Sequence, residues 1–332
     1  MKKIVSFYGA SSDILQKLNQ RAKEYAASRG FEYEWAVQSP YNREDVIQRL
    51  QDADAGIIDV EPYDEEVFRE ICGRTRLLVR FGVGYDKVDL EAASQYGIAV
   101  ARTTGANTLA VAEMALSLIL ALRRKLPQNH RLVKTRDWKQ LVVNEAVGST
   151  VGIVGFGAIG QALAGMLKAL SCRVLAYDPY PRIDIAEQYG VELVGVEELF
   201  RRSDAISLHL PYLEETHHFV NAAKLGLMKP GAVIVNTSRG NIVDEDALYE
   251  ALSQNKIAGA ALDVFAEEPL PETSPLMGLD NILMTPHTSS QTEESLWRIY
   301  QLAIDIAADF FQGCDSPHIL NGVSYREAAR RA

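Results

Sequence analysis

The sequence predicts an α/β protein built from two doubly wound parallel sheets, with one domain inserted into a second, discontinuous one. Short apolar runs typical of strands alternate with helical patterns over nearly all 332 residues. The alternation is interrupted once, by polar and irregular sequence near residues 127–149. A last helical pattern, residues 293–311, is not followed by a strand of its own domain, so we expect it to cross back to the first. A chain of this length suits two cores better than one.

The first half of the chain predicts a flavodoxin-like outer domain. Its strand-like runs are KIVSFYG, FEYEWAV, AGIIDV, LLVRFG and IAVAR. The helical patterns between them cover residues 13–29, 44–53, 64–71 and 88–96. The longest helical pattern, residues 107–126, follows the last of these strands.

The second half predicts a Rossmann-type domain. Its strand-like runs are TVGIVGF, CRVLAYD, VELV, AISLHL, AVIVNTS, IAGAALDVF and NILMTPH. Helical patterns lie between them at residues 159–170, 183–189, 196–202, 221–228 and 245–254. We therefore expect an outer domain of residues 1–101 and 289–332 and an inserted domain of residues 102–288.

Composition and charge exclude several classes of protein. The formal net charge of −10 argues against binding to nucleic acid or to an anionic membrane. The most apolar stretch, residues 109–122, is too short to span a bilayer and contains Glu113. Cys72, Cys172 and Cys314 form no pair with disulfide or zinc spacing. A protein of the reducing cytoplasm is the prediction.

A glycine-rich turn predicts a dinucleotide site. Residues 155–160 read GFGAIG, which is GxGxxG between a strand and a helix. Gly155 permits the tight turn, Gly157 lets the backbone approach a pyrophosphate, and Gly160 allows close packing of helix on strand. Ala158 and Ile159 begin the helix whose positive N-terminal dipole faces the phosphates. The alternative is a turn that only packs a strand against a helix.

Asp178 predicts the choice of cofactor. It ends the second strand 18 residues after the last glycine of the motif, where a carboxylate accepts a hydrogen bond from the ribose of NAD and repels the phosphate of NADP. NAD is therefore the expected cofactor. Asp178 could instead form a turn beside Pro179, and Arg182 is the basic residue that could reverse the preference.

Three downstream strands carry ionisable residues to the edge where the glycine turn lies. AVIVNTS ends at Arg239, IAGAALDVF is followed by Glu268, and NILMTPH ends at His287. Ligands of open parallel sheets bind at this carboxyl edge. Taken singly, Arg239 could cap a turn, Glu268 could be solvated and His287 could be a buried structural histidine, but their convergence favours a catalytic group.

These residue types suit reduction of a 2-oxo acid. Arg239 can hold a carboxylate with paired hydrogen bonds and polarise the carbonyl. His287 can give a proton to the oxygen as hydride arrives, and take it back in the reverse direction. Glu268 would orient the imidazole and favour its charged form. The other histidines lack metal-ligand spacing, so no catalytic metal is expected.

The chain closely resembles the D-isomer-specific 2-hydroxyacid dehydrogenase family over nearly its whole length. The matching segments are RFGVGYDKVDLEAA, GANTLAVAE, TVGIVGFGAIG, SDAISLHLPYLEET, MKPGAVIVNTSRGNIVDEDAL, AALDVFAEEPL and TPHTSS. The resemblance implies the same roles for Arg239, Glu268 and His287. It also implies that Val83 and Gly84 offer backbone amides to the substrate carboxylate. Further implied cofactor contacts are His209, Thr216, Thr237, Asp263, which would meet the nicotinamide carboxamide, and Ser290.

The resemblance implies a homodimer through the nucleotide domains, to which the long helix from Asn107 would contribute. It leaves the substrate open among lactate, glycerate, hydroxypyruvate, glyoxylate and phosphoglycerate chemistry. In this family the loop holding Asp59 and Glu61 approaches the distal end of the substrate, and two carboxylates there would oppose a phosphate. We therefore expect a hydroxypyruvate or glyoxylate reductase, with D-3-phosphoglycerate dehydrogenase or a corepressor-like NAD-binding interaction protein as alternatives. Asp59 and Glu61 could equally be solvated turn residues.

Overall fold

The computed structural model describes residues 1–9, 12–37 and 41–330, which form two compact units. The outer unit comprises Met1–Asn107 and Gln291–Ala332, and the inner unit Thr108–Ser290. The first boundary lies beyond the expected residue 101 because Arg102 and Thr103 still bond to the outer unit, through His318 and Gly82. The second lies slightly beyond residue 288.

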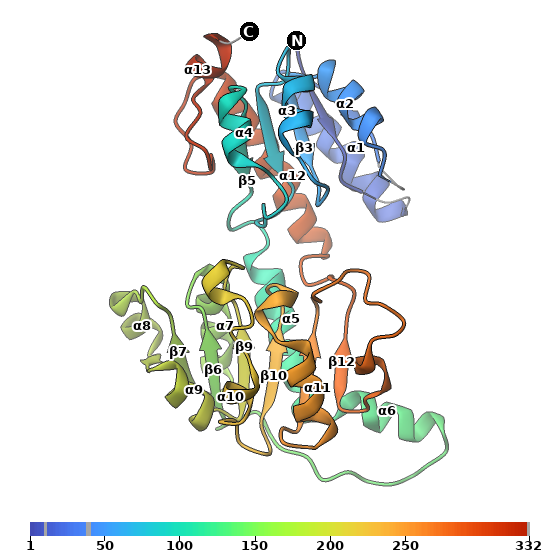
Figure 1. Ribbon diagram of the computed structural model, residues 1–332, viewed down its shortest axis with the longest axis vertical. Helices are drawn as coiled ribbons and strands as arrows, with labels where there is room; N and C mark the ends of the chain where they lie inside the picture. The colour runs from blue at the N-terminus through green and yellow to red at the C-terminus, as the bar shows by residue number, and fades with distance from the viewer. Residues whose placement is uncertain (10–11, 38–40, 331–332) are drawn as a thin grey trace. The chain divides into compact units, whose positions relative to one another are not determined.

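The described part of the outer unit contains a parallel five-stranded sheet in the order β2-β1-β3-β4-β5, the flavodoxin-like order. Figure 1 labels β3 and β5 of this sheet. The strands are β1 (Lys2–Ser6), β2 (Phe31–Trp35), β3 (Ala55–Ile58), β4 (Leu77–Arg80) and β5 (Ala99–Arg102). One face packs against α1 (Asp13–Ser28) and α12 (Glu293–Phe311). The other face packs against α2 (Arg43–Gln51), α3 (Glu65–Ile71) and α4 (Leu90–Gln95). A short helix, α13 (Tyr325–Arg330), follows α12.

Helix α12 confirms the prediction that the last long helix returns to the outer domain. Its Ile299 and Tyr300 side chains are buried in one core with Ile4 of β1 and Leu77 of β4. Tyr300 donates a hydrogen bond to the backbone oxygen of Tyr8 at 3.2 Å. Because apolar residues recur along one face of the helix, burial of that face drives its docking on the sheet.

The described part of the inner unit contains a parallel seven-stranded sheet in the order β12-β11-β10-β9-β6-β7-β8. The strands are β6 (Thr150–Val154), β7 (Arg173–Tyr177), β8 (Glu192–Leu193), β9 (Ala205–Leu208), β10 (Val233–Asn236), β11 (Gly259–Leu262) and β12 (Ile282–Met284). From β6 the chain builds β7 and β8 to one side and β9 to β12 to the other. This order is the Rossmann arrangement, which creates a ligand-binding crevice where the direction reverses, between β6 and β9.

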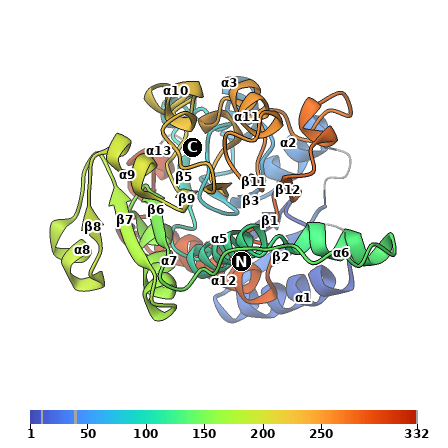
Figure 2. The ribbon, with the colours of Figure 1, turned by 90° about the horizontal axis from the view of Figure 1, so that it is seen from below.

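Helices cover both faces of the inner sheet, as Figure 2 shows. The helices on one face are α5 (Thr108–Arg123), α7 (Ala158–Ala169) and α8 (Ile183–Tyr189). Those on the other face are α9 (Val196–Arg202), α10 (Ala222–Leu225) and α11 (Glu245–Ser253).

The helix expected over residues 107–126 is present as α5, three residues shorter at its end, and the segment expected to be irregular begins with a further helix. Helix α5 ends at Arg123, and a new helix, α6 (Leu126–Lys134), follows. Lys125 between them has a left-handed backbone, with a φ of 47°, and Pro127 lies in the first turn of α6. Proline is well suited to that position because it has no N–H to satisfy there. In the described ranges, neither these helices nor any other is long and apolar enough to cross a membrane.

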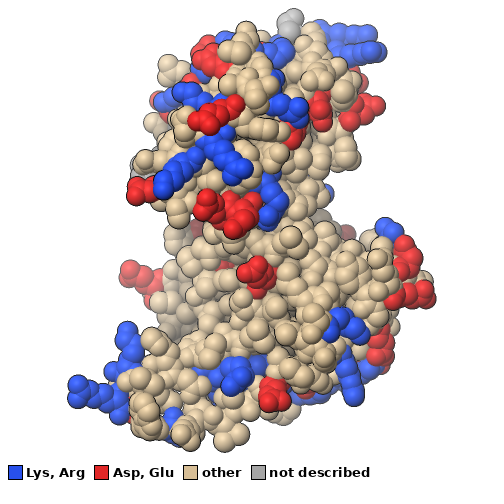
Figure 3. Space-filling model, turned by 180° about the vertical axis from the view of Figure 1, so that it is seen from behind, with Lys and Arg blue, Asp and Glu red and all other residues tan. Residues whose placement is uncertain are grey.

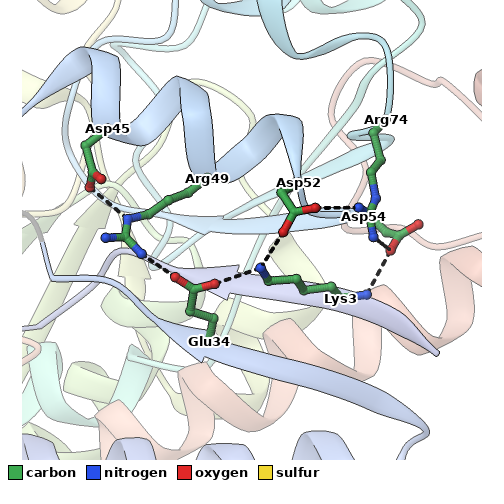
Figure 4. Close-up of polar contacts among 7 residues, drawn as sticks. All are labelled: Lys3, Glu34, Asp45, Arg49, Asp52, Asp54 and Arg74. Atoms are coloured by element: carbon green, nitrogen blue, oxygen red, sulfur yellow. Dashed lines mark hydrogen bonds and ion pairs between the residues drawn. The ribbon is translucent and has the colours of Figure 1, made fainter.

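An ion-pair network joins β1, β2 and α2 of the outer unit at the sheet edge (Figure 4). The Lys3 ammonium lies 2.8 Å from Glu34 and 2.9 Å from Asp52. Glu34 also pairs with Arg49, and Asp52 with Arg74. The hydrogen bond from Lys3, opposed in part by burial, holds the pKa of Glu34 below its ordinary value. The network therefore ties the first two strands to the helix that follows them.

Candidate active site

The loops after β10, β11 and β12 carry the three predicted catalytic residues at the carboxyl edge of the inner sheet. These strands are neighbours, paired residue by residue. His287 Nδ1 lies 2.8 Å from Glu268 Oε2. An ionised carboxylate can only accept hydrogen bonds, so Nδ1 carries the proton of this bond. Nε2 is then the ring nitrogen that can exchange a proton with a substrate.

Glu268 is held and charged by its surroundings. Its Oε1 accepts a hydrogen bond from the backbone N–H of Phe265 at 3.0 Å. Burial pushes the pKa of Glu268 upward, but the hydrogen bonds from His287 and Phe265 and the charges of His287 and Arg239 bring it below its ordinary value. Glu268 therefore presents an ionised oxygen in a fixed position to the imidazole.

The backbone of the β10 loop brings Arg239 close to Glu268. The buried Asn236 donates from Nδ2 to the Arg239 carbonyl at 2.8 Å and accepts from the Ser238 N–H at 3.0 Å, which fixes the turn after the strand. A Cβ atom on Gly240 would lie 1.9 Å from the carbonyl carbon of Phe265. Only glycine allows the β10 loop to approach the β11 loop so closely.

Asp263 holds the loop that carries His287. The Asp263 side chain is fully buried, and it accepts hydrogen bonds from Thr285 Oγ1 at 2.6 Å, the Thr288 N–H at 2.8 Å and the Ser289 N–H at 2.9 Å. The His287 N–H donates to the Asp263 carbonyl at 2.8 Å, while His287 itself has a φ of 52°. In the structure, Asp263 therefore holds the His287 loop, a role that the sequence did not predict. The expected contact of Asp263 with a nicotinamide carboxamide stays a prediction.

The glycine turn has the geometry that its motif predicts. Gly155 has a φ of 95°, and a Cβ atom there would lie 2.7 Å from the carbonyl of His209. A Cβ atom on Gly160 would lie 2.4 Å from the carbonyl oxygen of Gly155. Gly157, by contrast, faces open space at the N-terminus of α7, which begins at Ala158 and continues through Ile159. The turn therefore leaves backbone N–H groups accessible to a phosphate.

Two buried polar atoms at the same edge have no hydrogen-bond partner among the described residues. They are His209 Nδ1 and Thr237 Oγ1, which follow β9 and β10. The other ring nitrogen of His209 bonds to Ser207 Oγ at 2.9 Å, and burial lowers the pKa of His209 to about 4, so the ring is neutral. Unpartnered buried polar atoms are costly unless a ligand or water satisfies them. Together with the open glycine turn, they fit a dinucleotide.

Asp178 lies at the end of β7, where its carboxylate links two loops. Its oxygens accept hydrogen bonds from the Phe156 N–H at 2.8 Å and the Tyr180 N–H at 2.9 Å. The second bond is the turn-forming interaction considered as an alternative role, but neither bond fills the acceptor capacity of a carboxylate. Arg182 pairs with Asp184 through two hydrogen bonds, of 3.1 and 2.8 Å. Its charge is therefore largely satisfied within its own loop.

The remaining predicted residues are placed as follows. Thr216 Oγ1 accepts from the Leu213 N–H at 2.7 Å and donates to the Pro211 carbonyl at 2.8 Å, so it shapes the loop after β9. Ser290 is the last residue of the inner unit. Val83 and Gly84 lie between β4 and α4 of the outer unit. Ligand contacts by these residues stay predictions. In the residues that the structure describes, no three His, Cys, Asp or Glu side chains could hold a metal ion.

Sequence reasoning missed Asn236 and the holding role of Asp263. Both act through hydrogen bonds to backbone groups that become neighbours only when the strands pair. The one available signal was their position, since each is a polar residue at the carboxyl end of an otherwise apolar strand.

Known proteins share this arrangement. The sequence model of the D-isomer specific 2-hydroxyacid dehydrogenase NAD binding domain matches residues 116–289. The chain is 37% identical over 294 residues to a glyoxylate reductase of Korarchaeum cryptofilum, covering 86% of this chain and 88% of that protein. It is 35% identical over 310 residues to a D-3-phosphoglycerate dehydrogenase of Archaeoglobus fulgidus, covering 93% of this chain but 58% of the relative.

A solved structure agrees with these relatives. The D-lactate dehydrogenase of Aquifex aeolicus, complexed with NAD and lactic acid, superposes with a TM-score of 0.81 at 28% identity, covering 97% of this chain and 100% of that one. The catalytic edge, the glycine turn and these similarities agree with one another. The chain therefore belongs to the D-isomer specific 2-hydroxyacid dehydrogenase family and is an NAD-dependent oxidoreductase.

Proposed function

We propose that the protein reduces a small 2-oxo acid to the 2-hydroxy acid, with Arg239, Glu268 and His287 as its catalytic group. The observation that carries this proposal is the 2.8 Å contact between His287 Nδ1 and a Glu268 carboxylate held by the backbone of its own loop. With Nδ1 bonded to Glu268, the His287 imidazole has Nε2 available to act as a general acid or base toward a substrate.

The proposed mechanism divides the reaction among the three residues. NADH, held at the glycine turn of residues 155–160, would supply the hydride that reduces the carbonyl carbon of the substrate. Arg239 pairs with the substrate carboxylate and polarises the carbonyl oxygen. As negative charge develops on that oxygen, His287 donates the proton from Nε2, and Glu268 stabilises the imidazolium until the proton leaves. The 2-hydroxy acid and NAD⁺ are the products.

Side chains of the outer unit favour an unphosphorylated substrate, but Asp59 and Glu61 do not contribute equally to this preference. Arg80, at the end of β4, lies 3.5 Å from Asp59 and offsets its charge. Glu61 keeps a buried oxygen, Oε2, without a hydrogen-bond partner in the described ranges, and burial together with the charge of Asp59 raises its pKa. A substrate hydroxyl could donate to Glu61, whereas a phosphate would be repelled by its ionised form. We propose glyoxylate or hydroxypyruvate.

NADH oxidation with glyoxylate, hydroxypyruvate and 3-phosphohydroxypyruvate tests the substrate. We expect kcat/KM to be at least about tenfold lower for the phosphorylated acid, since repulsion between two like charges that are partly desolvated costs roughly 1.4 kcal/mol or more. Glu61→Gln should narrow this difference, while Glu66→Gln, on the exposed side of α3, should not. A clear preference for 3-phosphohydroxypyruvate would instead identify a D-3-phosphoglycerate dehydrogenase. No turnover with any 2-oxo acid would favour the corepressor-like alternative.

We also propose that the protein is a cytoplasmic homodimer. In the segment of residues 124–149, Trp138 and Val142 are 81% and 95% exposed. Exposed large apolar side chains on one segment are typical of an association surface. The cytoplasmic location is supported by the three free thiols, since a reducing compartment keeps cysteines from forming disulfides. Light scattering after size-exclusion chromatography should give twice the chain mass. Trp138→Asp should reduce the dimer fraction, whereas Tyr180→Asp, at a residue 88% exposed elsewhere in the inner unit, should not.

A further inference from the structure

A basic hollow lies at the amino edge of the inner sheet, opposite the carboxyl edge that carries the catalytic residues. It encloses about 420 Å³ where β6, β7 and β8 begin, and its walls include the first residue of each strand, Thr150, Arg173 and Glu192. Five basic residues line it and only one acidic residue, Glu192, does so. The basic residues are Lys168, Arg173, Arg201, Arg202 and Lys229.

Three of these basic residues have carboxylate partners. Arg202 pairs with Glu192 and Glu198, Arg201 pairs with Glu197 at 3.0 Å, and Lys229 pairs with Asp204 at 2.8 Å.

The other two, Lys168 and Arg173, have no carboxylate partner in the part of the chain that the structure describes. Counted with the carboxylates that pair with the other three basic residues, these two cations give the hollow a small excess of positive charge in a chain whose net charge is −10.

The exposed Lys168 side chain is anchored by one hydrogen bond. Its ammonium donates to the carbonyl of Gly190 at 3.1 Å, at the C-terminus of α8, where a helix end attracts positive charge. Gly190 has a φ of 62°, and a Cβ atom there would lie 3.3 Å from the Lys168 nitrogen. The glycine thus leaves room for the ammonium. One of the three donors of Lys168 is used by this bond, and the others are available to a ligand.

We propose that this hollow binds a small multivalent anion of the phosphate or polyphosphate class, at a site separate from the dinucleotide. Lys168 and Arg173 would supply the unpaired charges, and Arg202 the neighbouring guanidinium. The five residues of β6 separate the hollow from the glycine turn by about 17 Å, at roughly 3.3 Å per residue. One ligand cannot contact both sites, so the proposal does not depend on the function of the carboxyl edge.

Calorimetric titration of the NADH-saturated protein with inorganic pyrophosphate tests this site. Saturation with NADH occupies the glycine turn, which would otherwise bind pyrophosphate itself. NaCl keeps the ionic strength constant, so that charge screening is the same in every titration. The matched variants are Lys168→Gln/Arg173→Gln and Lys17→Gln/Lys256→Gln. Each removes two exposed positive charges, the second pair outside the hollow.

We expect pyrophosphate to bind the wild type and the control variant equally, with a Kd of about 1 mM or less, and to bind the hollow variant at least about tenfold more weakly. Thermal melts of both variants establish that they are folded. The proposal is overturned if the NADH-saturated wild type shows no binding above the NaCl control. It is also overturned if the two double variants lose affinity equally, because the effect would then follow net charge alone.

Discussion

At the scale of single residues, the catalytic group depends on the carboxylate that faces His287. Glu268 fixes the imidazole through Nδ1, and its second oxygen is tied to the backbone N–H of Phe265. The pKa of Glu268 lies below its ordinary value. The stabilisation of the native state by ionised Glu268 is therefore fully present above the ordinary carboxyl pKa, and it is lost only as pH falls through the lower folded pKa.

Glu268→Gln tests the electrostatic part of this pairing. An amide keeps a hydrogen-bonding partner for the ring but loses the negative charge, so the imidazolium is stabilised less. The rate of 2-oxo acid reduction should then begin to fall at a lower pH than in the wild type, as measured from kcat/KM between pH 5 and 9. Glu267→Gln, at the neighbouring exposed carboxylate, is the control. An unchanged profile in Glu268→Gln would mean that the carboxylate only orients the ring.

Asp184 controls whether Arg182 is available to a phosphate. Asp184→Ala removes the carboxylate that holds the Arg182 guanidinium. The released arginine should raise kcat/KM with NADPH several-fold while Asp178 still favours NADH, because an arginine near the ribose accommodates the 2′-phosphate. The double variant Asp184→Ala/Arg182→Ala should remove this gain. Equal NADPH activity in the single and double variants would exclude Arg182 from cofactor choice.

At the scale of elements, the site depends on how the loops after β10, β11 and β12 contact one another. The sequence was sufficient to predict that Arg239, Glu268 and His287 lie at strand ends on one edge of the sheet, because strand periodicity is a local pattern and the edge rule applies to any parallel sheet. It could not predict the hydrogen bonds that Asp263 accepts from the His287 loop, which require paired strands. Helix α6 was also missed, because its residues are largely polar and the left-handed Lys125 that separates it from α5 leaves no compositional signal.

Gly240→Ala tests the contact between the β10 and β11 loops. The added Cβ atom would overlap the Phe265 carbonyl carbon, 1.9 Å away, so the loops must separate and Arg239 must move from Glu268. We expect kcat/KM to fall by about 10²-fold, as small displacements of catalytic groups do. Gly231→Ala, where the added atom meets open space just before β10, should keep wild-type kinetics. Wild-type kcat/KM in Gly240→Ala would show that the loop contact does not position Arg239.

At the scale of the whole molecule, each unit is stabilised by its own sheet and its own cores. Basic and acidic side chains are interspersed on the face drawn in Figure 3, among larger uncharged areas. The two parallel-sheet domains were predictable from the alternation of strands and helices. The boundary after Asn107 was not, because it is set by hydrogen bonds of Arg102 and Thr103 to distant parts of the outer unit.

Glu34→Gln tests the ion-pair network of the outer unit. The hydrogen bond from Lys3, and to a smaller extent the bond from Arg49, lower the pKa of Glu34 against the opposing effect of burial. Ionised Glu34 therefore stabilises the folded state above its ordinary pKa, and this stabilisation is lost as pH falls through the lower folded pKa. We expect Tm at pH 7 to fall by roughly 1–3 °C, as partly exposed ion pairs contribute little, and the difference to vanish as pH falls through the lowered pKa of Glu34. Glu32→Gln, an exposed residue of the same strand, should not change Tm. A pH-independent difference would point to lost packing instead.

The measurement that tests the central claim most directly is kcat for NADH oxidation with glyoxylate and hydroxypyruvate in the wild type and in His287→Ala, with NADH affinity measured by fluorescence. If His287 is the proton donor, kcat should fall by about 10² to 10⁴-fold while NADH binds nearly as tightly as to the wild type. Near wild-type turnover in His287→Ala would contradict the assignment and leave His287 as a structural residue of the β12 loop.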